Sequence, residues 1–278
     1  MLLPSGSTEM LALFGAAIHA SPSPRTHTHW AQSLGLNLLY LPLTCTNEAE
    51  FLNLASSLMS CPQFRGGNIT NPFKTAALKL PNIELNESTL ACGAGNTLHR
   101  IGDSWRLSNT DLSGCESSIH KILKDCSLPI DVFILGTGAM SRTVSVALDR
   151  VSSELQLKPR KILKISRGVL ELGSFEVLNS ILPTHCLVIN TLPGSTQSEA
   201  DTRATQFLSS LASSRNADSF VLFELSYTET QAIQFARSNG WAVETGHHLF
   251  ETQAKESFKL WTNHYPPSES DVQWPNRE

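Results

Sequence analysis

The sequence predicts an α/β protein with two domains, of which the second is a Rossmann-like, doubly wound domain. Short apolar runs alternate with helical patterns along nearly the whole chain, as expected for parallel strands joined by crossover helices. A loop with two glycines follows one of these runs, within residues 133–142. The chain has 278 residues, 41% of them hydrophobic, which is enough for two ordinary domains with their own cores.

The first half of the chain alternates strands and helices. Gly35 is placed to close the first helix, and Asn47 is placed to cap the second. The turn at 102–104 predicts a hairpin. A short strand ends near Thr70, and Lys74 is expected to open a helix. The predicted elements are a strand in 10–18, a helix over 25–35, a strand over 36–43, a helix over 47–59, a hairpin over 96–111 and a helix over 113–124.

The second half repeats the alternation more regularly, which favours a parallel sheet with helices between its strands. Strands are expected over 129–136, 161–166, 185–190, 218–225 and 241–245, and helices over 139–152, 170–181, 197–213 and 228–238. A last amphipathic helix covers 251–264, with Phe250, Ala254, Phe258 and Trp261 close to one face.

Composition excludes several classes of function. The formal charge is −4 and the pI is about 6.1, so we expect no nucleic-acid partner and no attraction to anionic membranes. Six cysteines without a CxxC pair are typical of free or buried thiols in a reducing compartment, and the spacing of the nine histidines predicts no metal site. No apolar run reaches the length of a membrane span, so a cytoplasmic location is expected.

The glycine loop "FILGTGAMSR" (133–142) has the order of strand, glycines and helix that a dinucleotide site needs. Gly136 permits a tight turn, Gly138 allows the backbone to approach a pyrophosphate, and Ser141 is small enough for close packing of helix and strand. The N-terminus of the helix supplies N–H groups for phosphates. The alternative is an ordinary strand-to-helix turn that uses glycine for its backbone freedom.

The end of the next predicted strand indicates which dinucleotide is bound. An NAD enzyme usually places a carboxylate there, but this chain has Ser166 followed by Arg167. An arginine can bind a 2′-phosphate with its planar fork, so the predicted cofactor is NADP. The alternative is a surface arginine after a strand.

The stretch "NITNPFK" (68–74) allows two interpretations. Taken alone, Thr70 or Asn71 is a helix cap, Pro72 lies in a first turn and Lys74 is a solvated helix residue. Taken together with the other motifs, the stretch is part of a second pattern: the chain resembles the shikimate dehydrogenase family from about residue 15 to residue 262. The motifs that carry the resemblance are "SPSPRTH" (21–27), "NITNPFK" (68–74), "GAGNT" (93–97), "NTDLSG" (109–114), "GTGAMSR" (136–142) and "ETQAKESFKLW" (251–261).

The resemblance implies the division into domains and the roles of the catalytic, substrate-binding and cofactor-binding residues. Residues 1–112 and the closing helix 247–264 would form the substrate-binding domain, 113–246 the NADP-binding domain and 265–278 a loose tail. Lys74 and Asp111 would be the catalytic pair, because an ammonium can stabilise charge on a ring oxygen and relay a proton. Substrate would contact Ser21, Ser23, Asn68, Thr70, Asn96, Tyr227 and Gln253, and cofactor would contact Gly136, Gly138, Ala139, Ser141, Ser166, Arg167 and Gly246.

The function implied is NADPH-dependent reduction of 3-dehydroshikimate to shikimate in aromatic amino-acid and chorismate biosynthesis, by a monomer or a homodimer. Two alternatives stay open: a broader quinate/shikimate dehydrogenase, and a shikimate-binding paralogue with little turnover. The Ser21 and Ser23 pair favours shikimate within the family. The family's pattern changes in the cofactor half, where Gly168 replaces a threonine and Glu224 an aspartate.

Overall fold

The computed structural model describes residues 4–126, 130–159, 161–165, 185–193, 198–214, 219–267 and 272–274. It separates into two compact units, Met1–Ser113 with Glu251–Glu278, and Gly114–Phe250. The predicted cofactor residues Ser166 and Arg167, and the predicted helix over 170–181, lie outside the described residues.

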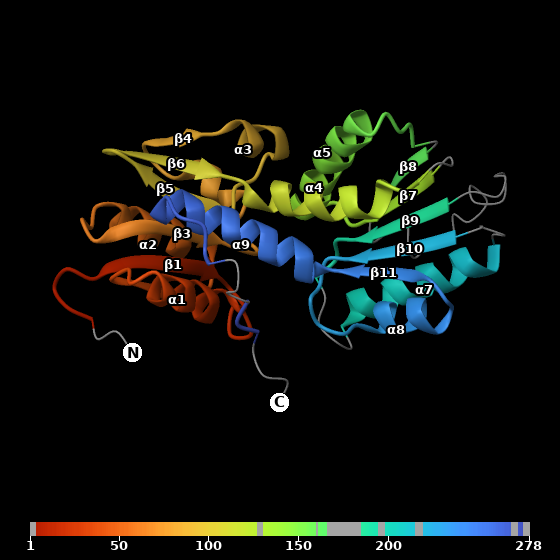
Figure 1. Ribbon diagram of the computed structural model, residues 1–278, viewed down its shortest axis with the longest axis horizontal. Helices are drawn as coiled ribbons and strands as arrows, with labels where there is room; N and C mark the ends of the chain where they lie inside the picture. The colour runs from red at the N-terminus through yellow and green to blue at the C-terminus, as the bar shows by residue number, and fades with distance from the viewer. Residues whose placement is uncertain are drawn as a thin grey trace. The chain divides into compact units, whose positions relative to one another are not determined.

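The first unit contains a six-stranded mixed sheet in the order β2-β1-β3-β5-β6-β4 (Figure 1). Parallel pairing joins β1 to β2 and β3, while β5 runs antiparallel to both β3 and β6, and β4 is parallel to β6. The strands are β1 (Glu9–Gly15), β2 (Leu38–Thr44), β3 (Phe64–Ile69), β4 (Ile83–Leu85), β5 (Thr97–Ile101) and β6 (Ser104–Ser108).

Helices cover both faces of the first sheet, because successive side chains of a buried strand point to opposite faces. Phe14 of β1 packs edge to face on Phe51 of α2, with ring centroids 5.7 Å apart. On the other face, Trp30 of α1 packs on Phe258 of α9 at 5.6 Å. The helices are α1 (Ser23–Ser33), α2 (Glu48–Met59), α3 (Glu87–Cys92) and α9 (Gly246–Thr262), with a 3₁₀ turn η1 (Ala76–Lys79).

The closing helix has the predicted apolar face. Phe250, Ala254, Phe258 and Trp261 are all buried, and the Trp261 indole donates to the backbone oxygen of Leu98 at 2.9 Å. The helix runs from Gly246 to Thr262, so it begins one residue before and ends two residues before the predicted bounds of 247–264, and it begins five residues before the amphipathic segment 251–264. Asn47 caps α2 as predicted, since its side chain accepts from the Glu50 backbone N–H at 3.0 Å.

The second unit is built on a five-stranded parallel sheet in the order β11-β10-β9-β7-β8, which confirms the predicted Rossmann-like fold class. β8, the next strand in the chain, lies on one side of β7, and β9 lies on the other side, so the direction of strand order reverses at β7. Ligands of such sheets bind outside the carboxyl ends of the strands at this reversal. The strands are β7 (Ile130–Leu135), β8 (Lys161–Ile165), β9 (His185–Asn190), β10 (Ser219–Glu224) and β11 (Ala242–Thr245).

The helices of the second unit lie on both faces of its sheet. Leu208 of α7 and Ile233 of α8 share one core with Val188 of β9 and Leu222 of β10. Figure 1 shows α5 on the other side of the sheet from α7 and α8, as right-handed crossovers on either side of a reversal require. The helices are α4 (Thr110–Leu123), α5 (Ala139–Glu154), α7 (Glu199–Ser214) and α8 (Gln231–Ser238). Within the described ranges, no helix combines the length and the apolar character that a membrane span needs.

Two expectations for the first unit were wrong. Lys74 opens no α-helix: it lies in a turn, and only the four-residue 3₁₀ turn η1 follows before Pro81. The tail is not loose throughout, because the backbone N–H of Gln273 donates to Thr26 Oγ1 at 3.0 Å and Val272 is buried.

Candidate active site

Lys74 and Asp111 form an ion pair in the first unit, with Nζ 2.8 Å from Oδ2. The lysine lies in the turn after β3, and the aspartate lies in the first turn of α4. Their side chains are only 12% and 8% exposed. A pair this poorly hydrated interacts more strongly than a surface pair, so each charge holds the other in place.

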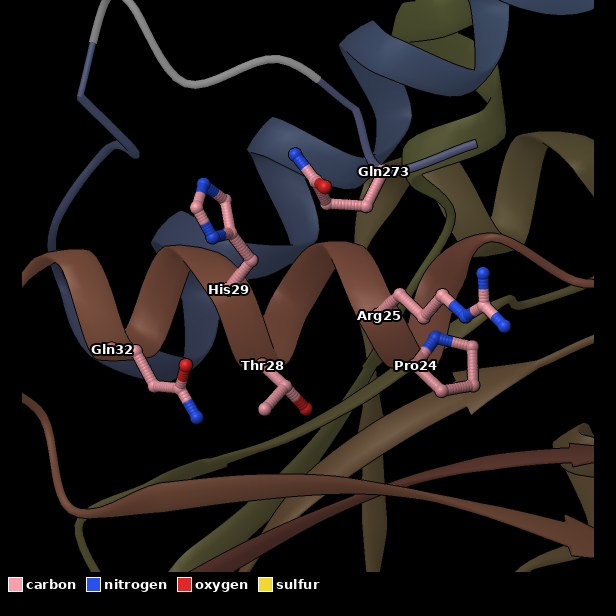
Figure 2. A pocket seen from close by; sticks show the side chains of 6 residues that line it. All are labelled: Pro24, Arg25, Thr28, His29, Gln32 and Gln273. Atoms are coloured by element: carbon pink, nitrogen blue, oxygen red, sulfur yellow. The ribbon is translucent and has the colours of Figure 1, made fainter. Parts of the chain in front are cut away.

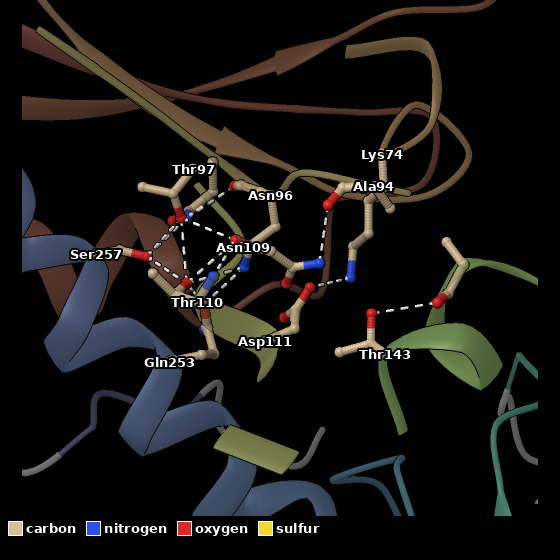
Figure 3. A network of polar contacts seen from close by, with 12 residues as sticks. Lys74, Ala94, Asn96, Thr97, Asn109, Thr110, Asp111, Thr143, Gln253 and Ser257 are labelled. Atoms are coloured by element: carbon tan, nitrogen blue, oxygen red, sulfur yellow. Dashed lines mark hydrogen bonds and ion pairs between the residues drawn. The ribbon is translucent and has the colours of Figure 1, made fainter. Parts of the chain in front are cut away.

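A set of buried polar side chains lies beside this ion pair, and we call it the buried polar cluster (Figure 3). It joins β3, β5, α4 and α9, which are far apart in the sequence. Burial of so many polar groups is tolerable only if they bond to one another. Its members are Asn68, Asn96, Thr97, Thr110, Gln253 and Ser257.

Asn96 uses its whole amide inside the cluster. Its Oδ1 accepts from the Thr110 backbone N–H at 2.7 Å and from Thr97 Oγ1 at 3.0 Å. Its Nδ2 donates to Thr110 Oγ1 at 3.0 Å and to Gln253 Oε1 at 3.4 Å. Since Thr110 is the first residue of α4, Asn96 caps that helix and thereby fixes the position of Asp111, the next residue.

Asn68 is oriented by partners on both ends of its amide. Its Oδ1 accepts from the Tyr40 hydroxyl at 2.8 Å, while its Nδ2 faces Ser257 Oγ at 3.0 Å, Thr97 Oγ1 at 3.1 Å and the backbone oxygen of Asn96 at 3.2 Å. Burial raises the pKa of Tyr40 far above its usual range, so this phenol stays protonated and donates. One lone pair of Asn68 Oδ1 is left to accept a further hydrogen bond.

The two predicted serines differ in their surroundings. Ser23 is buried at the start of α1, and its side chain bonds to that of Tyr40, which links it to Asn68. Ser21 is half-buried, and its hydroxyl accepts from the Ser23 backbone N–H at 3.3 Å. Thr70 is half-buried at the end of β3, and its methyl packs so closely on Gly15 that a Cβ there would lie 2.4 Å away.

His27 forms the apolar support of this region. Its ring stacks on Tyr40 with centroids 4.7 Å apart and planes at 21°, and it is completely buried. Neither ring nitrogen has a hydrogen-bond partner among the described residues. Burial lowers the pKa of His27 to about 3, so the ring is neutral. It packs against Tyr40 as an uncharged aromatic ring.

The glycine loop of the second unit has the features that a dinucleotide site requires. Gly136 has φ +111°, and a Cβ there would lie 2.5 Å from Thr191 Oγ1, so the turn needs glycine. Gly138 precedes α5 in an extended conformation, and apart from its neighbours in the chain no described residue has a heavy atom within 4 Å of where its Cβ would be. No side chain caps α5, and the buried hydroxyl of Ser141 has no hydrogen-bond partner among the described residues. The loop therefore fits a bound pyrophosphate at the helix N-terminus.

Gly246 has an explanation that needs no cofactor. A Cβ at this position would lie 2.1 Å from the backbone oxygen of Leu225, so the start of α9 can pack against that strand end only as glycine. Ala139 is the first residue of α5 and is half-buried. Tyr227 belongs to the second unit, where its ring packs edge to face on Phe250 at 5.7 Å and burial raises its pKa. Its predicted contact with substrate stays a prediction.

Sequence reasoning missed four residues of the first unit that hold the others. Thr97 and Thr110 each follow an asparagine inside a motif that was singled out, "GAGNT" and "NTDLSG". Ser257 follows Gln253 by one helical turn and therefore shares its face of α9, a spacing that was readable from the sequence. Tyr40 ends "GLNLLY" (35–40), a segment that also resembles the family's pattern, but no sequence feature marked its hydroxyl as part of the site.

A separate groove lies on the outer face of α1 and the adjoining tail, and Figure 2 shows its lining side chains. None of the predicted site residues lines it, and Arg25 and His29 are exposed there. The lining residues are Pro24, Arg25, Thr28, His29, Gln32 and Gln273.

Fold and site together define a two-domain α/β protein. A domain with a buried lysine–aspartate pair and a polar cluster is joined to a Rossmann-like domain with a dinucleotide-type glycine loop.

Comparison with known proteins shows which proteins this chain is similar to. Residues 13–98 match the model of the shikimate dehydrogenase substrate binding domain. Curated relatives named shikimate dehydrogenase (NADP(+)) include those of Microcystis aeruginosa, 27% identical over 94% of each chain, and Carboxydothermus hydrogenoformans, 29% identical over 95% of each chain. The crystal structure of shikimate dehydrogenase from Aquifex aeolicus has the same fold, with a TM-score of 0.74 at 20% identity over 95% of this chain and 96% of that one. Over nearly its whole length the chain is similar to these curated shikimate dehydrogenases.

Proposed function

We propose that this protein catalyses the reversible, NADP-linked reduction of 3-dehydroshikimate to shikimate, a step of aromatic amino-acid and chorismate biosynthesis. The observation that carries the proposal is the Lys74–Asp111 ion pair, 2.8 Å long and almost buried, next to a cluster of hydrogen-bonding side chains. The curated relatives carry the matching name over nearly their whole length.

Lys74 supplies the proton chemistry in this proposal. Reduction of a ring ketone builds negative charge on its oxygen, and the Lys74 ammonium stabilises that charge and gives it a proton. In the reverse direction the neutral amine takes the proton of the ring hydroxyl. Asp111 keeps Nζ in position throughout, and it accepts a hydrogen bond from a neighbouring ring hydroxyl. NADP(H), when bound, supplies the two-electron redox chemistry.

The remaining residues of the first unit would bind and orient the ring. The Gln253 carboxamide turns its oxygen toward Asn96 and Thr110. Its amide nitrogen, Nε2, is left to donate to a ring hydroxyl. Asn68 would accept a ring hydroxyl at the free lone pair of Oδ1. Ser21, Ser23 and Tyr227 would bind the carboxylate, and Thr70 would contact a further hydroxyl.

The cofactor would be held by the second unit. Gly138, Ala139 and the start of α5 suit the pyrophosphate, because the helix end presents backbone N–H groups and positive partial charge. Ser141 has a buried hydroxyl that is available for a hydrogen bond. On sequence grounds, Ser166 and Arg167 would bind the adenine ribose phosphate, which accounts for NADP as the cofactor.

The proposal is tested by the absorbance of NADPH with purified protein. Shikimate and quinate are each offered with NADP and with NAD, and shikimate binding is measured separately by calorimetry. We expect fast turnover with shikimate and NADP, and slower turnover in the other three combinations. Binding of shikimate without turnover in any combination would replace the dehydrogenase by a low-turnover binding paralogue. Equal rates with quinate would extend the substrate range.

A further inference from the structure

Ser257 lies at the point where the buried polar cluster meets α9. Its hydroxyl is completely buried and lies within hydrogen-bonding distance of three cluster members. The distances are 3.0 Å to Asn68 Nδ2, 2.9 Å to Thr97 Oγ1 and 2.9 Å to Thr110 Oγ1. In the described part of the chain, Ser257 and Thr97 are the two hydroxyls that bond directly to both Asn68 and Thr110.

The bonding pattern fixes the orientation of the Asn68 amide. The backbone oxygen of Asn96, 3.2 Å from Nδ2, can only accept, so the amide nitrogen must face into the cluster. With one N–H of Nδ2 on the Asn96 oxygen, the second N–H is shared between Ser257 Oγ at 3.0 Å and Thr97 Oγ1 at 3.1 Å, and the Ser257 proton goes to Thr97 or Thr110. At the other end, Tyr40 donates to Oδ1. The carbonyl oxygen of Asn68 is thus the group turned away from the cluster.

We propose that Ser257 is a positioning residue for substrate, acting through Asn68. It holds the Asn68 amide so that the second lone pair of Oδ1 stays directed at a hydroxyl of a ring polyol. The proposal rests on the proposed function and adds to it the direction of one contact: the ligand hydroxyl donates and Asn68 accepts.

Removal of the Ser257 hydroxyl therefore weakens binding more than turnover. In Ser257→Ala, the Asn68 amide loses the nearer of two hydroxyl acceptors and keeps only Thr97 Oγ1, so the Asn68 side chain gains rotational freedom. Loss of one hydrogen bond in a buried setting lowers affinity by roughly five- to fiftyfold. We expect the shikimate KM and the calorimetric Kd to rise by that factor, while kcat stays within about twofold because Lys74 and Asp111 are untouched.

A matched control separates this effect from general loss of stability. Thr89 of α3 is also completely buried in the first unit, and its hydroxyl donates to the backbone oxygen of Leu107 at 2.8 Å, outside the cluster. Thr89→Val removes a buried hydroxyl of the same kind. It should lower the thermal midpoint as Ser257→Ala does and leave the shikimate KM unchanged.

Tyr40→Phe tests the same amide from its other end. It removes the hydroxyl that bonds to Asn68 and to Ser23 and keeps the ring on His27, so a rise in KM at least as large as in Ser257→Ala, with little change in kcat, is expected. Normal KM in both Ser257→Ala and Tyr40→Phe, or in Tyr40→Phe alone if the serine variant does not fold, overturns the positioning role while the dehydrogenase stands. Wild-type protein that neither binds nor oxidises shikimate overturns both.

Discussion

Asn190 donates a hydrogen bond from Nδ2 to Oε2 of Glu224 across 2.7 Å, and the two residues are register partners at the carboxyl ends of β9 and β10. The other carboxyl oxygen accepts from the Ser226 backbone N–H at 3.2 Å. Burial raises the pKa of Glu224 to about 7; these hydrogen bonds oppose the rise, and the charge of Asp201 adds to it. One carboxyl group thus connects the loops after two neighbouring strands of the nucleotide-type domain.

Glu224→Gln should remove a pH dependence of stability in the second unit. The unfolded carboxyl has an ordinary pKa of 4.5, so between pH 4.5 and about 7 the folded protein keeps a proton that the unfolded chain releases. The free energy of unfolding therefore falls as pH rises through this window, by up to about 3 kcal/mol. Hydrogen exchange in β9 and β10, compared between wild type and variant at pH 5 and pH 8, measures it. If wild type and variant differ in hydrogen exchange by the same amount at pH 5 and at pH 8, the prediction is contradicted.

The first unit should respond to pH in the opposite direction through His27. Its folded pKa of about 3 lies below the ordinary 6.5, so its contribution to stability is complete above pH 6.5 and is lost progressively as pH falls toward 3. The loss amounts to roughly 4 kcal/mol over that range. His27→Phe keeps an aromatic ring against Tyr40 but cannot take up a proton. Urea denaturation at pH 4.5 and pH 7 should give a smaller pH difference for the variant, and an unchanged difference would disprove the assignment.

The second half of the fold was readable from the sequence because parallel strands buried on both faces are continuous apolar runs. The run over 185–190 coincides with β9, His185–Asn190. The first half contained elements too short to show a period: β4 has three residues and α3 has six. Phe73, Ala76, Ala77 and Leu80 have helical spacing, yet the chain makes only a 3₁₀ turn there, because Pro81 disfavours continuation of a helix.

The candidate site was predictable as a set of motifs and not as a network. Sequence reasoning chose Asn68 and Asn96 as ligand-binding amides, but the structure shows that most of their hydrogen-bonding capacity is used internally. Such pairing depends on residues 28 to 189 positions apart, as for Asn68 with Asn96 and with Ser257, and no local pattern reports it. Gly246 was chosen for the cofactor, and packing on Leu225 also requires glycine there, while its contact with cofactor stays a prediction.

The two glycines of the loop after β7 should respond differently to alanine. Gly136→Ala forces a Cβ toward Thr191 at φ +111° and should cost on the order of 1–3 kcal/mol of stability. Gly138→Ala meets no side chain or distant backbone among the residues that the structure describes and keeps an allowed φ of −80°, so the thermal midpoint should change little. The added methyl occupies the space that a pyrophosphate needs, and the Kd for NADPH, measured by its fluorescence, should rise at least about tenfold. Normal NADPH affinity in Gly138→Ala would argue for an ordinary strand-to-helix turn.

Lys74 and Asp111 should behave as one catalytic unit. Lys74→Met removes the proton donor and should lower kcat by roughly 10²–10⁴-fold, with a smaller effect on the shikimate KM. It also leaves the Asp111 carboxylate, 8% exposed, without the cation beside it, so the thermal midpoint should fall as well. Asp111→Asn keeps the shape but releases Nζ, and kcat should again fall. Because each residue works through the other, the double variant should lose little more kcat than Lys74→Met alone. It should also be more stable than that variant, because no unpaired buried charge remains.

Steady-state kinetics and thermal denaturation of wild type, the two single variants and the double variant provide the measurement. Multiplicative losses in kcat would show two independent roles, and a Lys74→Met protein with near-normal kcat would make Lys74 a structural partner of Asp111 and not the proton donor.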